Sequence, residues 1–146
     1  MYKRQVLSQA MRSREIHRTY QAFALGETAA SGTIDAPIAR LNGSLIQRTV
    51  DFASGERSVT HYRTLAHCSV FSHLELNLET GRTHQIRVHM AYIGHPLLGD
   101  TLYNKTPGTF PRQALHSASL SFVHPITGEP LNFHAPLPED MQNLLT

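Results

Sequence analysis

The sequence predicts an α+β domain, built on a mostly antiparallel mixed sheet with a few short helices. Segments rich in β-branched and aromatic residues outnumber segments with helical spacing. Short turns separate neighbouring extended segments, which allows them to pair as hairpins. The 146 residues, of which 40% are hydrophobic and 16% charged, are typical of one globular domain.

The first part of the chain is predicted to hold a short helix and then strands. Residues 6–14 carry apolar side chains at helical spacing. Residues 17–26 mix threonine, tyrosine, phenylalanine and leucine, which favours a strand. Residues 32–40 form a short extended piece, and residues 41–57 form a hairpin or long loop around the tight-turn pair Asn42-Gly43.

Two further strands and a helix are predicted in the middle. Residues 58–68 read as a strand, and residues 71–81 alternate leucine with polar residues, as a half-buried strand does. The helix that follows is expected to take Thr83 as its N-cap and to end at Gly94, because Pro96 prevents its continuation.

The last part of the chain continues this alternation. Residues 114–125 and 129–138 are predicted strands, and residues 138–145 are a predicted short helix with Pro138 near its first turn.

The turn before the central helix is rich in cations. Gly81 permits a tight bend, and the helix start offers unpaired N–H groups to an anion. Arg82 adds charge there, and Arg87 lies one turn beyond Thr83, on roughly the same side. This chemistry predicts a phosphate or carboxylate site. The alternative is that Arg87 pairs with a nearby acid to hold the fold.

Other catalytic chemistries find less support. His84 and His89 lie about 140° apart around a helix and cannot bind one metal ion from one face, so no metal is expected. His67, next to Cys68-Ser69, faintly matches the paired motifs of RNA phosphoesterases, without a second copy. Asp100 follows a Gly99 turn and reads either as a catalytic carboxylate or as a local backbone cap.

Composition and charge indicate the compartment of the protein and the partners it could bind. No apolar run approaches the roughly 18 residues of a membrane helix, and the start lacks the apolar centre of a signal peptide. The single cysteine favours a reducing compartment, so we expect a cytoplasmic protein. The net charge is only +2, but five cations stand against Glu15 within residues 1–20: Lys3, Arg4, Arg12, Arg14 and Arg18. They fit a surface for a polyanion or, equally, a solvated helix face.

One long stretch resembles a known family. The letters "LETGRTHQIRVHMAYIGHPLLGDTLY", residues 78–103, closely resemble the RluA-type pseudouridine synthases, which convert uridine to pseudouridine in ribosomal or transfer RNA. "RSREIHRTYQAF", "GTIDAPIAR", "SVTHYRTL" and the closing residues 114–141 match further family segments in order.

The resemblance implies a mechanism and a set of site residues. It implies an RNA partner (rRNA or tRNA), no cofactor, no metal, and a target base flipped out of its RNA context. Tyr20 matches the tyrosine that packs on that base, and Arg87 matches the arginine that pairs with the catalytic aspartate. Four residues of the central motif and two apolar residues are expected to bind substrate: Arg82, Thr83, His84, Gln85, Leu115 and Leu120.

The sequence departs from its family in one respect. The aspartate motif Arg-Leu-Asp-x-x-Thr-Ser-Gly, expected upstream of Tyr20, does not occur in it. We therefore expect residues 6–146 to be the C-terminal portion of a synthase catalytic domain, inactive alone, with Arg87 waiting for an acid that the chain lacks. Residues 1–5 are expected to be foreign or a miscalled start. The alternative is a non-catalytic RNA-binding module.

Overall fold

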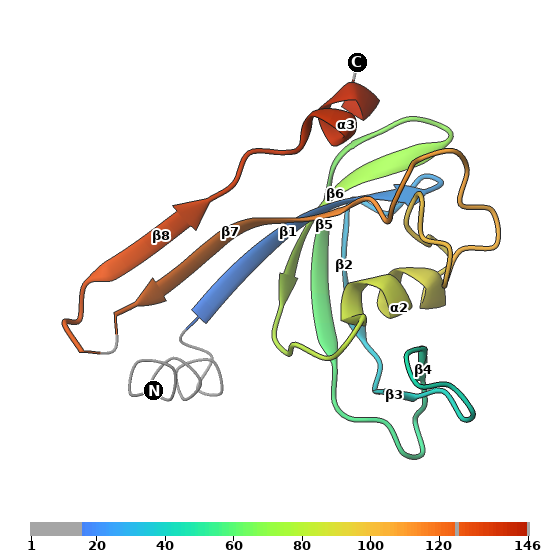
Figure 1. Ribbon diagram of the computed structural model, residues 1–146, viewed down its shortest axis with the longest axis horizontal. Coiled ribbons are helices and arrows are strands. Elements are labelled where there is room, and N and C mark those ends of the chain that lie inside the picture. The colour runs from blue at the N-terminus through green and yellow to red at the C-terminus, as the bar shows by residue number, and fades with distance from the viewer. Residues whose placement is uncertain (1–15, 125, 146) are drawn as a thin grey trace.

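The computed structural model describes residues 16–124 and 126–145, which form one main sheet with short helices on it (Figure 1). The predicted helix at residues 6–14 lies outside the described residues. The elements are β1 (Ile16–Leu25), β2 (Ser31–Asp35), β3 (Ile38–Arg40), β4 (Arg48–Val50), β5 (Val59–His67), β6 (Phe71–Leu78), α2 (Gln85–Tyr92), β7 (Leu115–Val123), β8 (Pro130–His134), α3 (Glu139–Gln142) and the 3-10 turn η1 (Asn143–Leu145).

The main sheet has six strands in the order β2-β5-β6-β1-β7-β8, and every pairing is antiparallel among the described residues. The predicted α+β class and antiparallel pairing are confirmed. The β5–β6 and β7–β8 pairs are hairpins of neighbouring strands, as the short turns required. β1 lies in the centre, so its two neighbours satisfy both of its edges.

Alternation along β1 divides the core between the two faces of the sheet. Ala22 and Ala24 belong to a cluster that includes Ile86 and Met90 of α2. Phe23 points to the opposite face, where it packs with Met141 of α3. Helix α2 therefore covers one face of the sheet, and the C-terminal helix packs against the other (Figure 1).

A hairpin or long loop was predicted within residues 41–57, but the hairpin begins earlier: its first strand is β3, which ends at Arg40, and only its turn and its second strand, β4, lie in that range. The two strands form a separate two-stranded sheet. Gly43 has φ of 84°, so Asn42-Gly43 turns the chain at its tip. The ring of Phe52, just after β4, lies 6.5 Å from that of Tyr92 at the end of α2. The hairpin consequently sits beside α2, as Figure 1 shows.

The start of α2 differs from the prediction. Thr83 is not the N-cap: the cap position is His84, in the left-handed conformation with φ of 56°, and it makes no side-chain capping bond. The reason is that the side chain of Gln85 reaches back to the backbone N–H of Arg82, which leaves Thr83 exposed in the turn. The predicted end is confirmed, since the helix stops at Tyr92 and Gly94 has φ of 88°.

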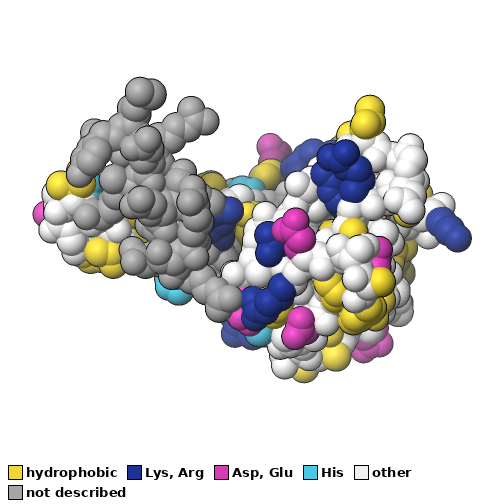
Figure 2. Space-filling view, turned by 90° about the horizontal axis from the view of Figure 1, so that it is seen from below, with side chains coloured by type: hydrophobic (Ala, Val, Ile, Leu, Met, Phe, Trp, Pro, Cys, Tyr) yellow, Lys and Arg dark blue, Asp and Glu magenta, His cyan; other side chains and the backbone are white. Residues whose placement is uncertain are grey.

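Charges of both signs share the visible surface. In Figure 2, Lys and Arg side chains lie interspersed with Asp and Glu on the part of the face that the described residues form. Within residues 16–124 and 126–145, no helix is long and apolar enough to span a membrane.

Candidate functional site

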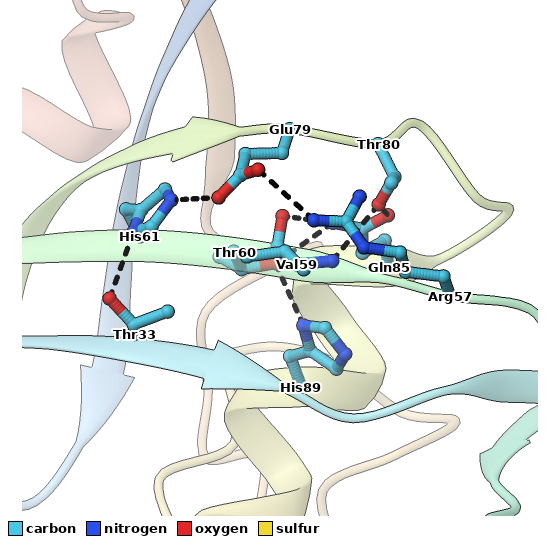
Figure 3. Close-up of polar contacts among 9 residues, drawn as sticks. All are labelled: Thr33, Arg57, Val59, Thr60, His61, Glu79, Thr80, Gln85 and His89. Atoms are coloured by element: carbon cyan, nitrogen blue, oxygen red, sulfur yellow. Dashed lines mark hydrogen bonds and ion pairs between the residues drawn. The ribbon is translucent and has the colours of Figure 1, made fainter.

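The turn between β6 and α2 is fixed by the amide of Gln85 (Figure 3). Its Nε2 donates to the carbonyl of Val59 and to Oγ1 of Thr60, each at 3.0 Å. Its Oε1 accepts the hydroxyl of Thr80 at 2.7 Å and the backbone N–H of Arg82 at 3.0 Å. Because Gln85 is only 2% exposed, these bonds tie the turn to β5 and the end of β6.

His89 extends this network one turn along the helix (Figure 3). Its Nε2 lies 2.8 Å from the carbonyl of Ala36, which can only accept, so Nε2 carries the proton. Its Nδ1 therefore accepts the hydroxyl of Thr60 at 2.8 Å. Burial lowers the pKa of His89, which keeps the imidazole neutral.

Ion pairs surround the same turn on the solvent side. Nε2 of His61 lies 2.6 Å from Glu79, and Nη2 of Arg57 lies 3.2 Å from it (Figure 3). Hydrogen bonds from His61 and Arg57 lower the pKa of Glu79. Arg82 donates from Nε to the carbonyl of Arg57 at 2.9 Å and pairs with Glu56 at 2.8 Å. These two contacts fix the guanidinium of Arg82 beside the segment that leads into β5.

Arg87 has an acidic partner within the chain, which corrects the expectation that its acid is missing. Its Nε donates to Oδ2 of Asp100 at 2.9 Å and its Nη2 to Oδ1 at 2.8 Å. The Asp100 side chain is fully buried and that of Arg87 is 13% exposed. Asp100 also accepts the backbone N–H groups of Leu102 and Tyr103, so it is both a local backbone cap and an ion-pair partner.

The environment keeps this pair ionised. Burial raises the pKa of Asp100, but hydrogen bonds from Arg87 and from the backbone of Tyr103 and Leu102 outweigh it, so the pKa lies below its usual value. The hydrogen bonds to Asp100 in turn raise the pKa of Arg87. Nη1 of Arg87 takes part in neither bond to Asp100 and can donate to a further acceptor.

Tyr103 is a site residue that the sequence analysis did not single out. Its ring lies under the guanidinium of Arg87, 5.1 Å from the central carbon to the ring centre. Its hydroxyl accepts the backbone N–H of Arg48 on β4 at 2.9 Å and lies 2.7 Å from Nδ1 of His84. The sequence carries no signal for this role, because Arg48 and His84 reach Tyr103 only in the folded protein.

His84 holds a strained position between the turn and the helix. A φ of 56° is costly for a side chain with a Cβ, and such strain is found at functional sites. Burial and the nearby charges of Arg87 and Arg48 lower its pKa. Its Nδ1 lies 2.7 Å from the hydroxyl of Tyr103, so a hydrogen bond joins the turn to the loop after Asp100.

The remaining predicted residues lie in the main sheet, on β1 and β7. Tyr20 and Leu115 are partly buried and pack against the cluster that contains Ile86 and Met90 of α2. Leu120 is also partly buried, and in the sheet it stands opposite Arg18 and Phe133. The fold thus brings Tyr20 and Leu115 to the sheet face under α2.

The glycine before Asp100 is constrained on two grounds. Gly99 has φ of 73°, and a Cβ there would collide with the backbone carbonyl oxygen of Arg112. The backbone entering Asp100 is therefore packed directly against the segment that leads into β7.

A hollow lies away from this turn. A cavity of about 410 Å³ is lined by residues of β1, β6, the loop at 106–111 and the C-terminal helices, among them Leu25, Phe71 and Leu144. Its lining includes no predicted site residue. His67 is exposed, with Nδ1 3.2 Å from Glu27. Within the described part of the chain, no cluster of three or more His, Cys, Asp or Glu could hold a metal ion.

Comparison with known proteins places this chain in a family. Residues 4–92 match the family described as RNA pseudouridylate synthase, and the chain belongs to that family. It is 50% identical over 141 residues to the uncharacterized RNA pseudouridine synthase YjbO of Bacillus subtilis, covering 96% of this chain and 50% of that protein. It is 44% identical over 153 residues to the ribosomal large subunit pseudouridine synthase D of Escherichia coli K12, covering 95% of this chain and 47% of that one.

Solved structures agree with this assignment. The human RNA pseudouridylate synthase domain containing 1 superposes with a TM-score of 0.78 at 26% identity, covering 90% of this chain and 59% of that chain. The human RNA pseudouridylate synthase domain containing 4 superposes with a TM-score of 0.77 at 21% identity, covering 95% of this chain and 64% of that chain. It shows the shared fold. The chain spans about half the length of the curated relatives it matches.

Proposed function

We propose that this chain supplies the arginine and tyrosine side of the active site of an RNA pseudouridine synthase that acts on ribosomal or transfer RNA. The observation that carries the proposal is the position of the Arg87 guanidinium, which is largely buried and is held in place by Asp100 and the Tyr103 ring. Its Nη1 takes part in neither bond to Asp100 and is left for a further acceptor. Relatives at 44–50% identity are named for this activity. A cytoplasmic location fits the ribosomal large subunit for which the E. coli relative is named.

The reaction requires a carboxylate that this sequence does not place at the family position. No Arg-Leu-Asp motif precedes Tyr20. Asp100 is a poor substitute, because it is fully buried and accepts four hydrogen bonds from Arg87 and the backbone. We propose that residues 6–146 correspond to the C-terminal portion of a catalytic domain. In it, Nη1 of Arg87 would hold the nucleophilic aspartate ionised while Nε and Nη2 hold Asp100.

The balance of the reaction defines what the residues must do. The bond between C1′ and N1 of uridine breaks, the base turns over, and C1′ bonds to C5. The hydrogen of C5 leaves to solvent, and N1 gains a proton. Tyr20 would pack on the flipped base, with Leu115 and Leu120 as apolar lining. Arg82, Thr83 and His84 would contact the RNA. Gln85 would position the turn rather than touch RNA, because its amide is already saturated.

Release of tritium from RNA labelled at uridine C5 tests the activity. We expect none from the chain alone. We expect release when residues 6–146 are joined to the half of the B. subtilis relative that the chain does not cover. A fusion that folds and binds RNA but releases no tritium overturns the proposal.

The second candidate is a non-catalytic RNA-binding module, which the missing Arg-Leu-Asp motif favours. It predicts salt-dependent RNA binding by the chain and no tritium release from any fusion. The fusion assay therefore separates the two functions.

A further inference from the structure

The β3–β4 hairpin places two arginines directly opposite each other. Arg40 on β3 is the ladder partner of Arg48 on β4. The next pair toward the tip, Leu41 and Gln47, is joined by a backbone hydrogen bond, so the arginines form a non-hydrogen-bonded pair. In such a pair the Cα atoms are only about 4.5 Å apart and the side chains are closest. Like charges in this arrangement repel and weaken the hairpin.

No acid compensates this repulsion among the described residues. Arg48 donates from Nη1 to the carbonyl of Ile46 at 2.9 Å, and Arg40 is exposed. Five other arginines of the described chain each form an ion pair with a carboxylate: Arg57, Arg63, Arg82, Arg87 and Arg112. The hairpin pair differs from them in leaving two positive charges together without an acidic partner.

The hairpin is joined to the candidate site. The backbone N–H of Arg48 donates to the Tyr103 hydroxyl, which also contacts His84 and whose ring underlies Arg87. The charge of Arg48 is close enough to contribute to the lowered pKa of His84, after burial and Arg87. The two arginines therefore stand at the edge of the site rather than on a remote surface.

The tip of the hairpin is ordered and apolar. Oγ of Ser44 accepts the backbone N–H groups of Ile46 and Gln47 at 3.3 and 2.9 Å, which shapes the turn. Leu45 is 85% exposed and Ile46 62% exposed. Apolar side chains held out to solvent beside paired cations fit a partner that offers both phosphates and base faces.

We propose that the β3–β4 hairpin is an RNA-binding element, in which Arg40 and Arg48 contact backbone phosphates next to the target nucleotide and Leu45 and Ile46 contact its neighbours. This rests on the proposed function only in taking RNA as the partner. Phosphates between the two guanidinium groups would relieve the repulsion, so the hairpin would tighten when RNA binds.

The test compares two variants that each remove two positive charges. R40Q/R48Q removes the hairpin pair, and the control R63Q/R112Q removes arginines that already pair with Glu75 and Asp140. Binding of the whole chain to a stem–loop RNA with a loop uridine is measured by fluorescence anisotropy between roughly 50 and 200 mM salt. For R40Q/R48Q, we expect the slope of log affinity against log salt to fall by about 1.4 to 1.8, as for two lost phosphate contacts. The control should keep the parent slope.

Stability and partner specificity complete the design. R40Q/R48Q should melt no lower than the parent, because a repulsive pair is removed, so weaker binding cannot be assigned to unfolding. Equal slopes in the two variants, or a parent chain that does not bind RNA, overturn the inference. So does an equal loss of binding to polyglutamate, which would point to an acidic protein partner. A chain that binds RNA through the hairpin while the fusion releases no tritium overturns only the proposed isomerisation.

Discussion

The guanidinium of Arg87 donates two hydrogen bonds, of 2.9 and 2.8 Å, to the carboxylate of Asp100, which lies thirteen residues later in the sequence. One partner belongs to α2 and the other to the loop after Gly99. The pair thus joins the helix over the sheet to the loop that leads to β7.

Asp100→Asn should lower the free energy of unfolding by about 3 to 5 kcal/mol, because it leaves the largely buried guanidinium of Arg87 without a counter-charge. Urea unfolding measures the loss. Asp140→Asn is the matched control: Asp140 pairs with Arg112 in solvent, and its loss should cost less than about 1 kcal/mol. Equal losses in the two variants would contradict a structural role for the buried pair.

The same pair predicts a pH dependence. The pKa of Asp100 is depressed in the folded protein, so its contribution is complete above the unfolded pKa of about 4 and is lost as pH falls through the lower folded pKa. The parent should therefore lose stability more steeply below about pH 4 than Asp100→Asn does. Urea midpoints measured down to pH 2 would show it, and parallel curves would argue against it.

Arg87→Lys in the active fusion should lower tritium release on the order of a hundredfold or more, because an ammonium cannot hold two carboxylates in a planar fork. Arg87→Ala should abolish release. RNA affinity should change little in both, since phosphate contacts elsewhere dominate binding. A fully active Arg87→Ala fusion would remove Arg87 from the catalytic site.

Gln85→Met should destabilise the protein by at least about 2 kcal/mol, because it leaves the hydroxyl of Thr80 and the backbone N–H of Arg82 without their acceptor. Chemical unfolding gives the value, and Gln142→Met at an exposed position is the control. The RNA affinity of the folded Gln85→Met protein should match that of the parent. A large loss of affinity with unchanged stability would instead assign Gln85 to substrate contact.

Tyr103→Phe should cost about 1 to 2 kcal/mol, because the hydroxyl that accepts the Arg48 N–H and contacts His84 disappears. Hydrogen exchange at the Arg48 amide should become faster, because this amide loses its acceptor. The exchange rate therefore reports on the hairpin directly. Tyr92→Phe, on an exposed ring, serves as the control. Unchanged exchange at Arg48 would show that the hairpin does not depend on this bond.

The pattern of the strands predicted most of the fold because each strand carries its own signal. Residues 71–81 alternate leucine with polar residues, and Leu74 and Leu76 of β6 are fully buried. The end of α2 was predictable for the same local reason, since Gly94 permits the left-handed turn. The start was not. Gln85 competes for the backbone of Arg82 through contacts to β5, and spacing along the chain does not reveal those.

The site residues, like the elements of the fold, include some that the sequence predicted and some that it did not. Its cation-rich turn was evident from Arg82, His84 and Arg87 in the sequence. The partner of Arg87 was not, because Asp100 lies in another loop and its role as a cap hid its role as a counter-ion. Tyr103 was missed for a related reason, since its importance comes from Arg48 and His84, which only the fold brings to it.

Gly99 has an evolutionary consequence. Its left-handed backbone and the Arg112 carbonyl against it exclude any side chain. A library randomised at this codon and selected for well-folded protein should return glycine alone. A library randomised instead at the codon of the exposed Thr101 should return many residue types.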